Sequence, residues 1–165
     1  MHIIPERAGD AGTIRAVTQA AFASLAHSQQ TEAAIVDSLR ASGAITVSLV
    51  AVEGDEVLGH AAISPVTIDS GAQGWFGLGP VSVLPGRQGE GIGARLIRDA
   101  LNRLQASGGA GCVVLGDPGY YARFGFETQP GLVYGGAPPE YFQALAFRGG
   151  YPAGQVAYHD SFEAS

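Results

Sequence analysis

Hydrophobic residues recur at spacings of three and four across residues 91–107, which is the pattern of an amphipathic helix with one buried face. The apolar positions of this stripe are Ile92, Leu96, Ile97, Ala100, Leu101 and Leu104. The next residues, Gly108 and Gly109, are of the type that most often ends a helix. The pattern therefore predicts a helix over residues 91–107 that packs on the core through this stripe.

Two further helices are predicted near the N-terminus. Asp10 is a favourable N-cap for a helix that runs to about Leu25. The apolar stripe of this helix is formed by Ile14, Val17, Ala21 and Leu25. Thr31 begins the second helix and Gly43 ends it. Its inward positions are Ile35, Val36 and Leu39.

Short runs of β-branched and other apolar residues predict strands. The runs cover residues 2–5, 44–52, 56–68, 75–84, 111–115, 140–147 and 155–159. Residues 53–55 predict a hairpin turn, residues 118–123 a short helix, and residues 129–139 and 149–154 loops rich in glycine and proline. The resulting order, β-α-α-β-β-β-α-β-α-β-β, indicates a mixed α/β fold, and a chain of 165 residues fits a single domain over residues 1–165.

Composition narrows the classes of protein to consider. The net charge is −6 and the basic residues are nine arginines without a lysine, which argues against general nucleic-acid binding. Three of these arginines, Arg95, Arg98 and Arg103, are expected on the solvated face of the helix over residues 91–107. The apolar runs are too short to cross a bilayer, and no secretory signal pattern opens the chain. The single cysteine, Cys112, excludes an internal disulfide and fits a reducing, cytoplasmic compartment.

A glycine-rich turn lies between the strand over residues 75–84 and the helix over residues 91–107. Such a turn aims several backbone N–H groups and the positive end of a helix dipole at one point, where an anion binds. We therefore expect the backbone amides from Gln88 to Ala94 to hold a phosphate group. Glycines at positions 89, 91 and 93 let phosphate oxygens approach the backbone closely. The residues of this expected site are Gln88, Gly89, Glu90, Gly91, Ile92, Gly93 and Ala94.

Two other phosphate-binding motifs fit less well. A nucleotide-triphosphate P-loop needs a lysine, and this chain has none. A dinucleotide-binding Rossmann motif would use Gly91 and Gly93, with Asp117 as the acid for the ribose. Its third glycine is Leu96 here, and the turn is longer than the Rossmann turn. The Rossmann interpretation is therefore the weaker alternative.

The pattern Gln88-x-x-Gly91-x-Gly93 resembles the acyl-coenzyme A signature of the Gcn5-related N-acetyltransferase (GNAT) family. A second segment, in the expected order and distance, is similar to the tyrosine-containing segment that follows the family's fifth strand. It reads Tyr120-Tyr121-Ala122-Arg123-Phe124-Gly125-Phe126. The resemblance covers essentially the whole chain and is greatest to a bacterial subgroup whose substrates are mostly undefined. It implies a central mixed sheet of about seven strands with about four helices, in which the fourth and fifth strands splay apart.

The resemblance also implies roles for individual residues. Acetyl-coenzyme A would lie in the gap between the splayed strands, a position that suits Pro80, which cannot donate a hydrogen bond within a ladder. The cofactor-binding residues of the strand would be Val81, Ser82 and Val83, with a backbone N–H near Val83 facing the thioester oxygen. Tyr121 would be the general acid that protonates the departing thiolate, and Tyr120 is its competitor. Arg123 is expected to be structural and to pair with a carboxylate.

The general base stays open among Glu32, Asp37, His60, Ser82 and water. The four histidines, His2, His27, His60 and His159, show no spacing of metal ligands. Cys112 lies within a predicted strand, so an acetyl-cysteine intermediate is not expected. The expected function is transfer of an acetyl group from acetyl-CoA to a primary amine, of a small molecule or of a peptide or protein N-terminus, by direct attack in a ternary complex. A non-catalytic acyl-CoA sensor is the alternative from a different class, and the acceptor and a homodimer are left open.

Overall fold

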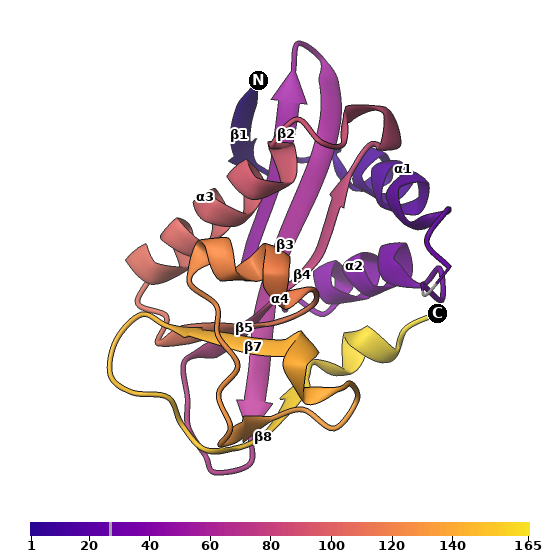
Figure 1. The fold of residues 1–165 in the computed structure, drawn as a ribbon. Helices are drawn as coiled ribbons and strands as arrows, with labels where there is room; N and C mark the ends of the chain where they lie inside the picture. The colour runs from indigo at the N-terminus through magenta and orange to yellow at the C-terminus, as the bar shows by residue number, and fades with distance from the viewer. Residues whose placement is uncertain (27) are drawn as a thin grey trace.

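The computed structural model describes residues 1–26 and 28–165, so the expectation for His27 lies outside the described residues. Eight strands form the sheet, in the order β1-β2-β3-β4-β5-β7, with β8 paired to β3 and β6 paired to β8 (Figure 1). The strands are β1 (His2–Pro5), β2 (Val47–Glu53), β3 (Glu56–Ile68), β4 (Trp75–Val83), β5 (Gly111–Leu115), β6 (Leu132–Val133), β7 (Phe142–Ala146) and β8 (Gly154–Tyr158). The predicted mixed α/β fold is confirmed.

Four α-helices and four short 3₁₀ segments accompany the sheet in the described chain. The helices are α1 (Ala11–Phe22), α2 (Glu32–Ala41), α3 (Ile92–Ala106) and α4 (Pro118–Tyr121). The 3₁₀ segments are η1 (Pro85–Arg87), η2 (Ala122–Phe124), η3 (Pro139–Tyr141) and η4 (Asp160–Glu163). Within the described ranges, we find no helix that has both the length and the apolar character needed to cross a membrane.

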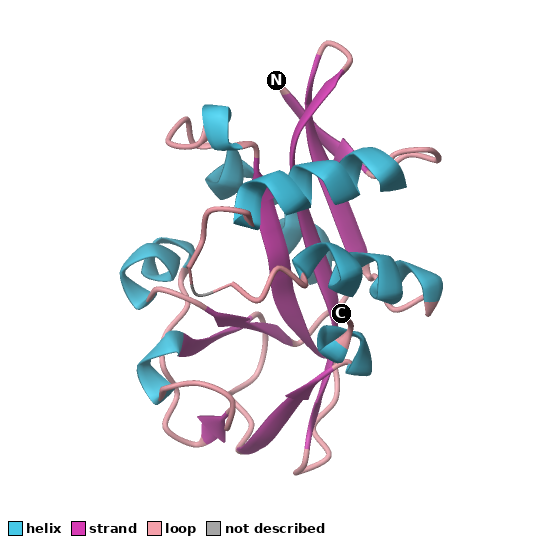
Figure 2. Cartoon of the chain, turned by 90° about the vertical axis from the view of Figure 1, so that its right-hand side faces the viewer, coloured by secondary structure: helices cyan, strands magenta, loops and turns pink. Residues whose placement is uncertain are grey.

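Helix α3 covers one face of the sheet, and helices α1 and α2 cover the other, as Figure 2 shows from the side of α1 and α2. The burial pattern of β2 demonstrates this arrangement, because successive residues of a strand face opposite sides. Leu49 packs into the cluster around α3, whereas its neighbour Val50 packs into the cluster formed with Ile14 and Val17 of α1. All six residues of the predicted α3 stripe are buried. The core therefore has two layers with the sheet between them.

Three local predictions need correction. Helix α1 ends at Phe22, not near Leu25, whose side chain is 37% exposed. The side-chain amide of Gln30 donates a 2.7 Å hydrogen bond to the Phe22 carbonyl and so satisfies one of the free carbonyl groups at the helix end. The spacing of apolar residues gives no sign of this contact. The segment over residues 129–139 is not all loop, because it contains β6. The strand predicted over residues 140–147 is shorter in the structure, because the chain forms η3 before β7 begins at Phe142.

Strands β4 and β5 separate after a short parallel ladder, as the family resemblance implied. Their last pair in the described chain is Leu78 with Val114, although β4 continues to Val83. The register of β4 against β3 shifts at this point, so that Ala62 faces both Gly79 and Pro80. This irregularity is a β-bulge, which bends a strand and re-aims its side chains. Pro80 thus lies at a bulge beside the separation of the two strands, and this gap positions the candidate site.

Candidate functional site

The backbone of β4 beyond Leu78 faces the gap in an alternating pattern. The Leu84 N–H donates a 2.9 Å hydrogen bond to the Leu58 carbonyl of β3. Pairs of opposite residues in an antiparallel ladder alternate between hydrogen-bonded and non-hydrogen-bonded pairs. Ser82 pairs with His60, two residues before Leu84 in the same register, so Ser82 is also hydrogen-bonded to β3. The N–H and C=O groups of Val81 and Val83 therefore point away from β3, into the gap left by β5.

The Ser82 side chain contacts helix α1 and not the gap. Its hydroxyl is 3.3 Å from the Thr18 hydroxyl of α1, and the residue is buried. A ligand in the gap would therefore meet neither the Ser82 side chain nor its ladder-paired backbone. Val83 has a further partner, because the Gln88 side-chain amide donates a 3.1 Å hydrogen bond to its carbonyl.

The glycine loop (residues 88–94) joins the end of β4, through η1, to the N-terminus of α3. Gly89 and Gly91 have φ values of +81° and +83°, and Gly91 is the N-cap residue of α3. Side chains rarely adopt this backbone conformation, so the loop needs glycine at both positions. A cavity of about 440 Å³ lies over the loop and the first turn of α3. It is lined by Val83, Arg87, Gln88, Gly89, Gly91, Ile92, Gly93, Ala94, Tyr120 and Arg123.

Two arginines line this loop cavity, and both have other partners. Arg87 pairs with Glu53 and Glu90 at 3.1 Å, and these carboxylates raise the pKa of its guanidinium. Glu90 thus turns its carboxylate towards Arg87. Arg123 was expected to pair with a carboxylate, and this is wrong: its Nε donates to the Tyr120 carbonyl at 2.8 Å, and its guanidinium lies 4.3 Å from the centre of the Tyr120 ring. A cation over an aromatic face is attracted by the ring quadrupole.

The neighbouring residues Tyr120 and Tyr121 serve different cavities. Their rings meet edge to face at 90°, with centroids 5.1 Å apart. The Tyr120 hydroxyl is 3.6 Å from the position that a Cβ would take on Gly93, in the loop cavity. Tyr121 instead lines a second cavity, at the gap between β4 and β5. A Cβ on Gly116 would lie 2.5 Å from the Tyr121 ring, so the glycine lets this ring lie against the chain just beyond β5.

Burial sets the protonation state of Tyr121. Removal from water raises the pKa of its hydroxyl to about 12, with a smaller contribution from Tyr120, because burial disfavours the phenolate. The hydroxyl therefore keeps its proton at neutral pH, as a proton donor must. Burial also raises the pKa of the Cys112 thiol, which has no exposed surface. The thiolate of Cys112 is thus disfavoured, and a nucleophilic role for it is unsupported.

The second cavity, which we call the split cleft, has a volume of about 470 Å³ and is lined in part by residues of α1 and α2. It joins both edges of the gap to residues far away in the sequence. Its lining is Phe22, Glu32, Ile35, Leu78, Gly79, Pro80, Val81, Leu115, Gly116, Asp117, Tyr121, Tyr134, Tyr158 and Phe162. Val81 lines the split cleft, whereas Val83 lines the loop cavity, so the exposed backbone of β4 runs from one cavity to the other.

The four candidate bases separate in space. Glu32 lines the split cleft, and its carboxylate accepts hydrogen bonds of 2.7 and 2.8 Å from the Ser28 hydroxyl. Asp37 lies elsewhere, in ion pairs with Arg15 and Arg40. His60 and Ser82 are buried outside the lining of the cleft. Glu32 is therefore the candidate that a substrate in the cleft could reach.

His60 is the buried end of a polar network, otherwise partly exposed, that joins α2 to the sheet. Arg40 donates to both oxygens of Glu6, and Ser48 donates to Glu6 at 2.6 Å. The Ser48 hydroxyl therefore accepts from His60 Nε2, which is 2.8 Å away, so His60 carries its proton on Nε2. Burial lowers the pKa of His60 to about 4, and the charge of Glu6 opposes this shift only in part. The ring is neutral at pH 7.

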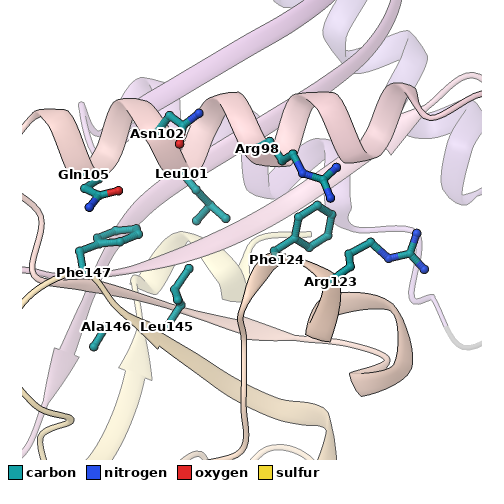
Figure 3. Close-up of a pocket in the computed structure, with 9 residues that line it drawn as sticks. All are labelled: Arg98, Leu101, Asn102, Gln105, Arg123, Phe124, Leu145, Ala146 and Phe147. Carbon is teal, nitrogen blue, oxygen red and sulfur yellow. The ribbon is translucent and has the colours of Figure 1, made fainter.

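Figure 3 shows a third hollow, beside the C-terminal half of α3. Its volume is about 410 Å³, and it lies between α3, η2 and the end of β7. Arg98 points from α3 towards the ring of Phe124, 5.0 Å from its centre. Arg98 was expected to lie on a solvated face, and here it also covers an aromatic ring. In the described part of the chain we find no group of three or more histidine, cysteine or acidic side chains that could hold a metal ion.

Comparison with known proteins places this geometry in a family. The model of the GNAT acetyltransferase domain matches residues 45–128, about half of the chain, from β2 through the tyrosine segment. The chain belongs to the GNAT acetyltransferase family. The family interpretation of the sequence is therefore confirmed, and the Rossmann alternative is not supported.

Two solved GNAT structures cover nearly all of the chain. A GNAT family acetyltransferase from Brucella melitensis, in complex with acetyl-CoA, is 55% identical with a TM-score of 0.88, over 98% of this chain and 97% of that chain. YhbS from Escherichia coli, in complex with CoA, is 32% identical with a TM-score of 0.89, over 98% of this chain and 91% of that chain. The sequence of YhbS from E. coli K12, an uncharacterized N-acetyltransferase, aligns at 39% identity over 58% of this chain and only 58% of its own length.

Four aromatic residues of the split cleft were not predicted from the sequence. They are Phe22, Tyr134, Tyr158 and Phe162. They come from the end of α1, the segment after β6, β8 and η4, and no shared motif connects these segments. The pairing of β8 with β3 brings Tyr158 to the cleft, and strand pairing over such a distance along the chain left no local signal.

Proposed function

We propose that the chain transfers an acetyl group from acetyl-CoA to a primary amine by direct attack in a ternary complex. One observation carries this proposal: the backbone groups of Val81 and Val83 face a gap that runs from the glycine loop to the split cleft. An elongated substrate with a phosphate at one end and amide groups in the middle fits this arrangement. Acetyl-CoA has that form, and the Brucella and E. coli relatives are solved with acetyl-CoA and CoA.

The glycine loop would bind the pyrophosphate. Amides of Gln88 to Ala94 and the N-terminus of the 15-residue helix α3 supply donors and a positive dipole end. Gly89 and Gly91 have open space where a Cβ would stand, as far as the described residues go, so phosphate oxygens could approach the backbone. The pantetheine amides would then pair with Val81 and Val83 as an added strand.

The thioester would lie at the end of the gap that opens into the split cleft. Because Val81 lines the cleft and Val83 lines the loop cavity, we assign the oxyanion contact to the Val81 N–H, two residues earlier than the sequence suggested. Ser82, with its hydroxyl at Thr18, would then act in neither contact directly.

The chemistry then needs a neutral amine and a proton for sulfur. The amine nitrogen attacks the thioester carbon, the C–S bond breaks, and the thiolate takes the proton of the Tyr121 hydroxyl. The nitrogen loses its proton to water or to Glu32, and solvent returns a proton to Tyr121. This assignment prefers Tyr121 to Tyr120, because Tyr121 lines the split cleft with Val81. The whole chain, residues 1–165, would act as one domain in the cytoplasm, and a homodimer stays a prediction.

Calorimetric titration of the purified protein with acetyl-CoA, with NAD as the comparison, tests the proposal. We expect saturable one-site binding of acetyl-CoA alone, followed by acetylated product when amines are added. Binding of acetyl-CoA without any product would support the acyl-CoA sensor instead. Binding of NAD alone would overturn the proposal.

A further inference from the structure

We infer, on the premise of the acetyl transfer proposed above, that the split cleft selects primary amines that have an apolar, preferably aromatic, body and no carboxylate. Three features of the cleft lead to this substrate class: its aromatic walls, the sign of its charges and one buried hydroxyl. The residues concerned are not among those that the proposed function gives to acetyl-CoA, which in the cleft are Val81 and Tyr121, so the inference concerns the acceptor.

The walls of the cleft are mainly aromatic where they leave the gap. Tyr158 stands at the centre of this group, with ring centroids 5.1 Å from Tyr134 and 5.0 Å from Phe162. The contact with Tyr134 is edge to face at 86°. Rings in such arrangements prefer another ring or an apolar chain beside them, because water cannot satisfy their surface. An apolar acceptor body would bury this surface, and a strongly hydrated one would not.

The charged side chains among the described lining residues of the cleft are all acidic. Two carboxylates, Glu32 and Asp117, line it, and among the described lining residues there is no arginine or other cationic side chain. One oxygen of the Asp117 carboxylate already accepts a 2.9 Å hydrogen bond from the Gly119 N–H at the start of α4. Among the described residues, the Glu32 carboxylate accepts hydrogen bonds from the Ser28 hydroxyl alone. An ammonium group would therefore be attracted, and an acceptor carboxylate would be repelled without a partner.

The Tyr158 hydroxyl is the third feature. It is shielded from water, and the described residues offer it no hydrogen-bond partner. Buried polar groups are nearly always paired, so an orphaned hydroxyl in a cleft indicates a group that arrives with the ligand. The ring packs closely against Gly77, since a Cβ at that position would lie 2.6 Å from its Cε1 carbon. We assign the Tyr158 oxygen as an acceptor for an N–H of the incoming amine.

A matched set of amines tests this substrate class. The set is phenethylamine, ethylamine, phenylalanine, spermidine and a short peptide with a free N-terminus, each assayed with saturating acetyl-CoA for kcat/KM. We expect phenethylamine to exceed ethylamine on the order of 100-fold, through burial of its ring. We expect it to exceed phenylalanine, which adds only a carboxylate, by a factor on the order of 100.

Two substitutions connect the preference to the cleft. Glu32→Gln should weaken the apparent affinity for phenethylamine, seen as a higher KM, and reduce the discrimination against phenylalanine. Tyr158→Phe should raise the KM for phenethylamine about tenfold. Both should leave the Kd for acetyl-CoA unchanged. Matched controls are Glu140→Gln and Tyr141→Phe, which change exposed residues outside the cleft and should leave every constant unchanged. Retention of the acetyl-CoA Kd shows that each variant is folded.

The outcomes separate the inference from the proposed function. Preferred acetylation of spermidine, phenylalanine or the peptide would overturn the inference and leave the acetyl transfer intact. Equal KM values for the wild type and both cleft variants would also overturn it. Binding of acetyl-CoA with acetylation of none of the five amines would count against both, in favour of a sensor.

Discussion

The two ends of the gap between β4 and β5 are built in different ways. The loop cavity comes mostly from one continuous stretch, residues 83–94, with Tyr120 and Arg123 added from α4 and η2. The split cleft draws on α1, α2, both edges of the gap, the segment after β6, β8 and η4. A cavity made of one stretch keeps its chemistry when distant segments change. A cavity assembled from many segments can change its specificity through any one of them, while the loop cavity stays unchanged.

The helices beside the two cavities are also attached to the sheet in different ways. Helix α3, on the loop side, is held by six buried apolar residues. Helix α2, which carries Glu32 and Ile35 of the split cleft, buries four apolar residues and is also joined to the sheet by polar contacts. These contacts run from the charged Arg40 to the partly buried Glu6, and from there to Ser48 and His60. Apolar packing is insensitive to pH, whereas a polar network depends on the protonation of its members. A fall in pH should therefore destabilise the region around the split cleft before it destabilises the region around the glycine loop.

The largest expected effect is on turnover, at the point where the two cavities meet. Tyr121→Phe removes the proposed acid but keeps the ring, and we expect kcat to fall about 10²–10⁴-fold. The Kd for acetyl-CoA should change little, because Tyr121 lies outside the loop cavity. Steady-state kinetics and calorimetry on the same preparation measure both values.

Tyr120→Phe is the matched control for that experiment. It removes a hydroxyl from the loop cavity, so its effect should appear in the binding of acetyl-CoA more than in kcat. A loss of kcat in Tyr120→Phe with full activity in Tyr121→Phe would exchange the roles of the two residues.

The next effect concerns stability and tests the polar anchoring of α2. The pKa of His60 falls from 6.5 to about 4 on folding, so the unfolded chain binds a proton between these values and the folded chain does not. The free energy of unfolding should therefore fall as the pH drops from about 6.5 to about 4, by about 3 kcal/mol in total. Glu6 and Asp10, whose pKa values are lowered in the fold, add their loss only below about 4.5.

Denaturant titrations at pH 7 and pH 5 measure this loss, with His60→Gln as the comparison. The variant should be less stable than the wild type at pH 7 but should lose less stability between the two values. If the wild type and the variant have parallel pH dependence, His60 is not the group that titrates.

A smaller effect is expected in the glycine loop. Gly91→Ala places a side chain at a φ of +83°, which costs about 1–2 kcal/mol and should raise the Kd for acetyl-CoA about tenfold. Gly86→Ala is the control, because Gly86 lies in η1 with an ordinary φ and open space around its Cβ position within the described chain. Isothermal titration calorimetry measures both. Equal Kd values in the two variants would show that the backbone conformation at Gly91 does not hold the phosphate.

The same contrast explains how much the sequence predicted. The glycine loop, the α3 stripe and β5 are local patterns, in which the residues that act together lie within a few turns of one another. They were predicted from spacing alone, and the structure confirms these elements. The separation of β4 from β5 near Pro80 was also expected, from the family resemblance and because proline cannot donate a hydrogen bond within a ladder.

The residues that were missed depend on contacts between distant segments. The end of α1 is fixed by Gln30, and Tyr158 reaches the split cleft only because β8 pairs with the far end of β3. The error for Arg123 has a similar cause. An arginine in a motif was assigned a carboxylate partner, but its partners in the fold are a carbonyl and an aromatic face. Such partners depend on how α4 and η2 pack, and the spacing of residues in the sequence does not predict that packing.

The smallest expected effect is an electrostatic one, on the binding of acetyl-CoA at the loop cavity. Arg87 offsets the charges of Glu53 and Glu90 at the rim of the loop cavity, and all three side chains are partly exposed. Arg87→Gln should change the free energy of unfolding very little, since exposed ion pairs contribute little. It leaves two carboxylates near the phosphate, so the Kd for acetyl-CoA should rise about threefold at low salt and recover at high salt. Glu90→Gln should shift the Kd in the opposite direction. A loss that persists at high salt would instead mean that Arg87 binds the phosphate directly, and the loop cavity would then depend on a side chain as well as on its backbone.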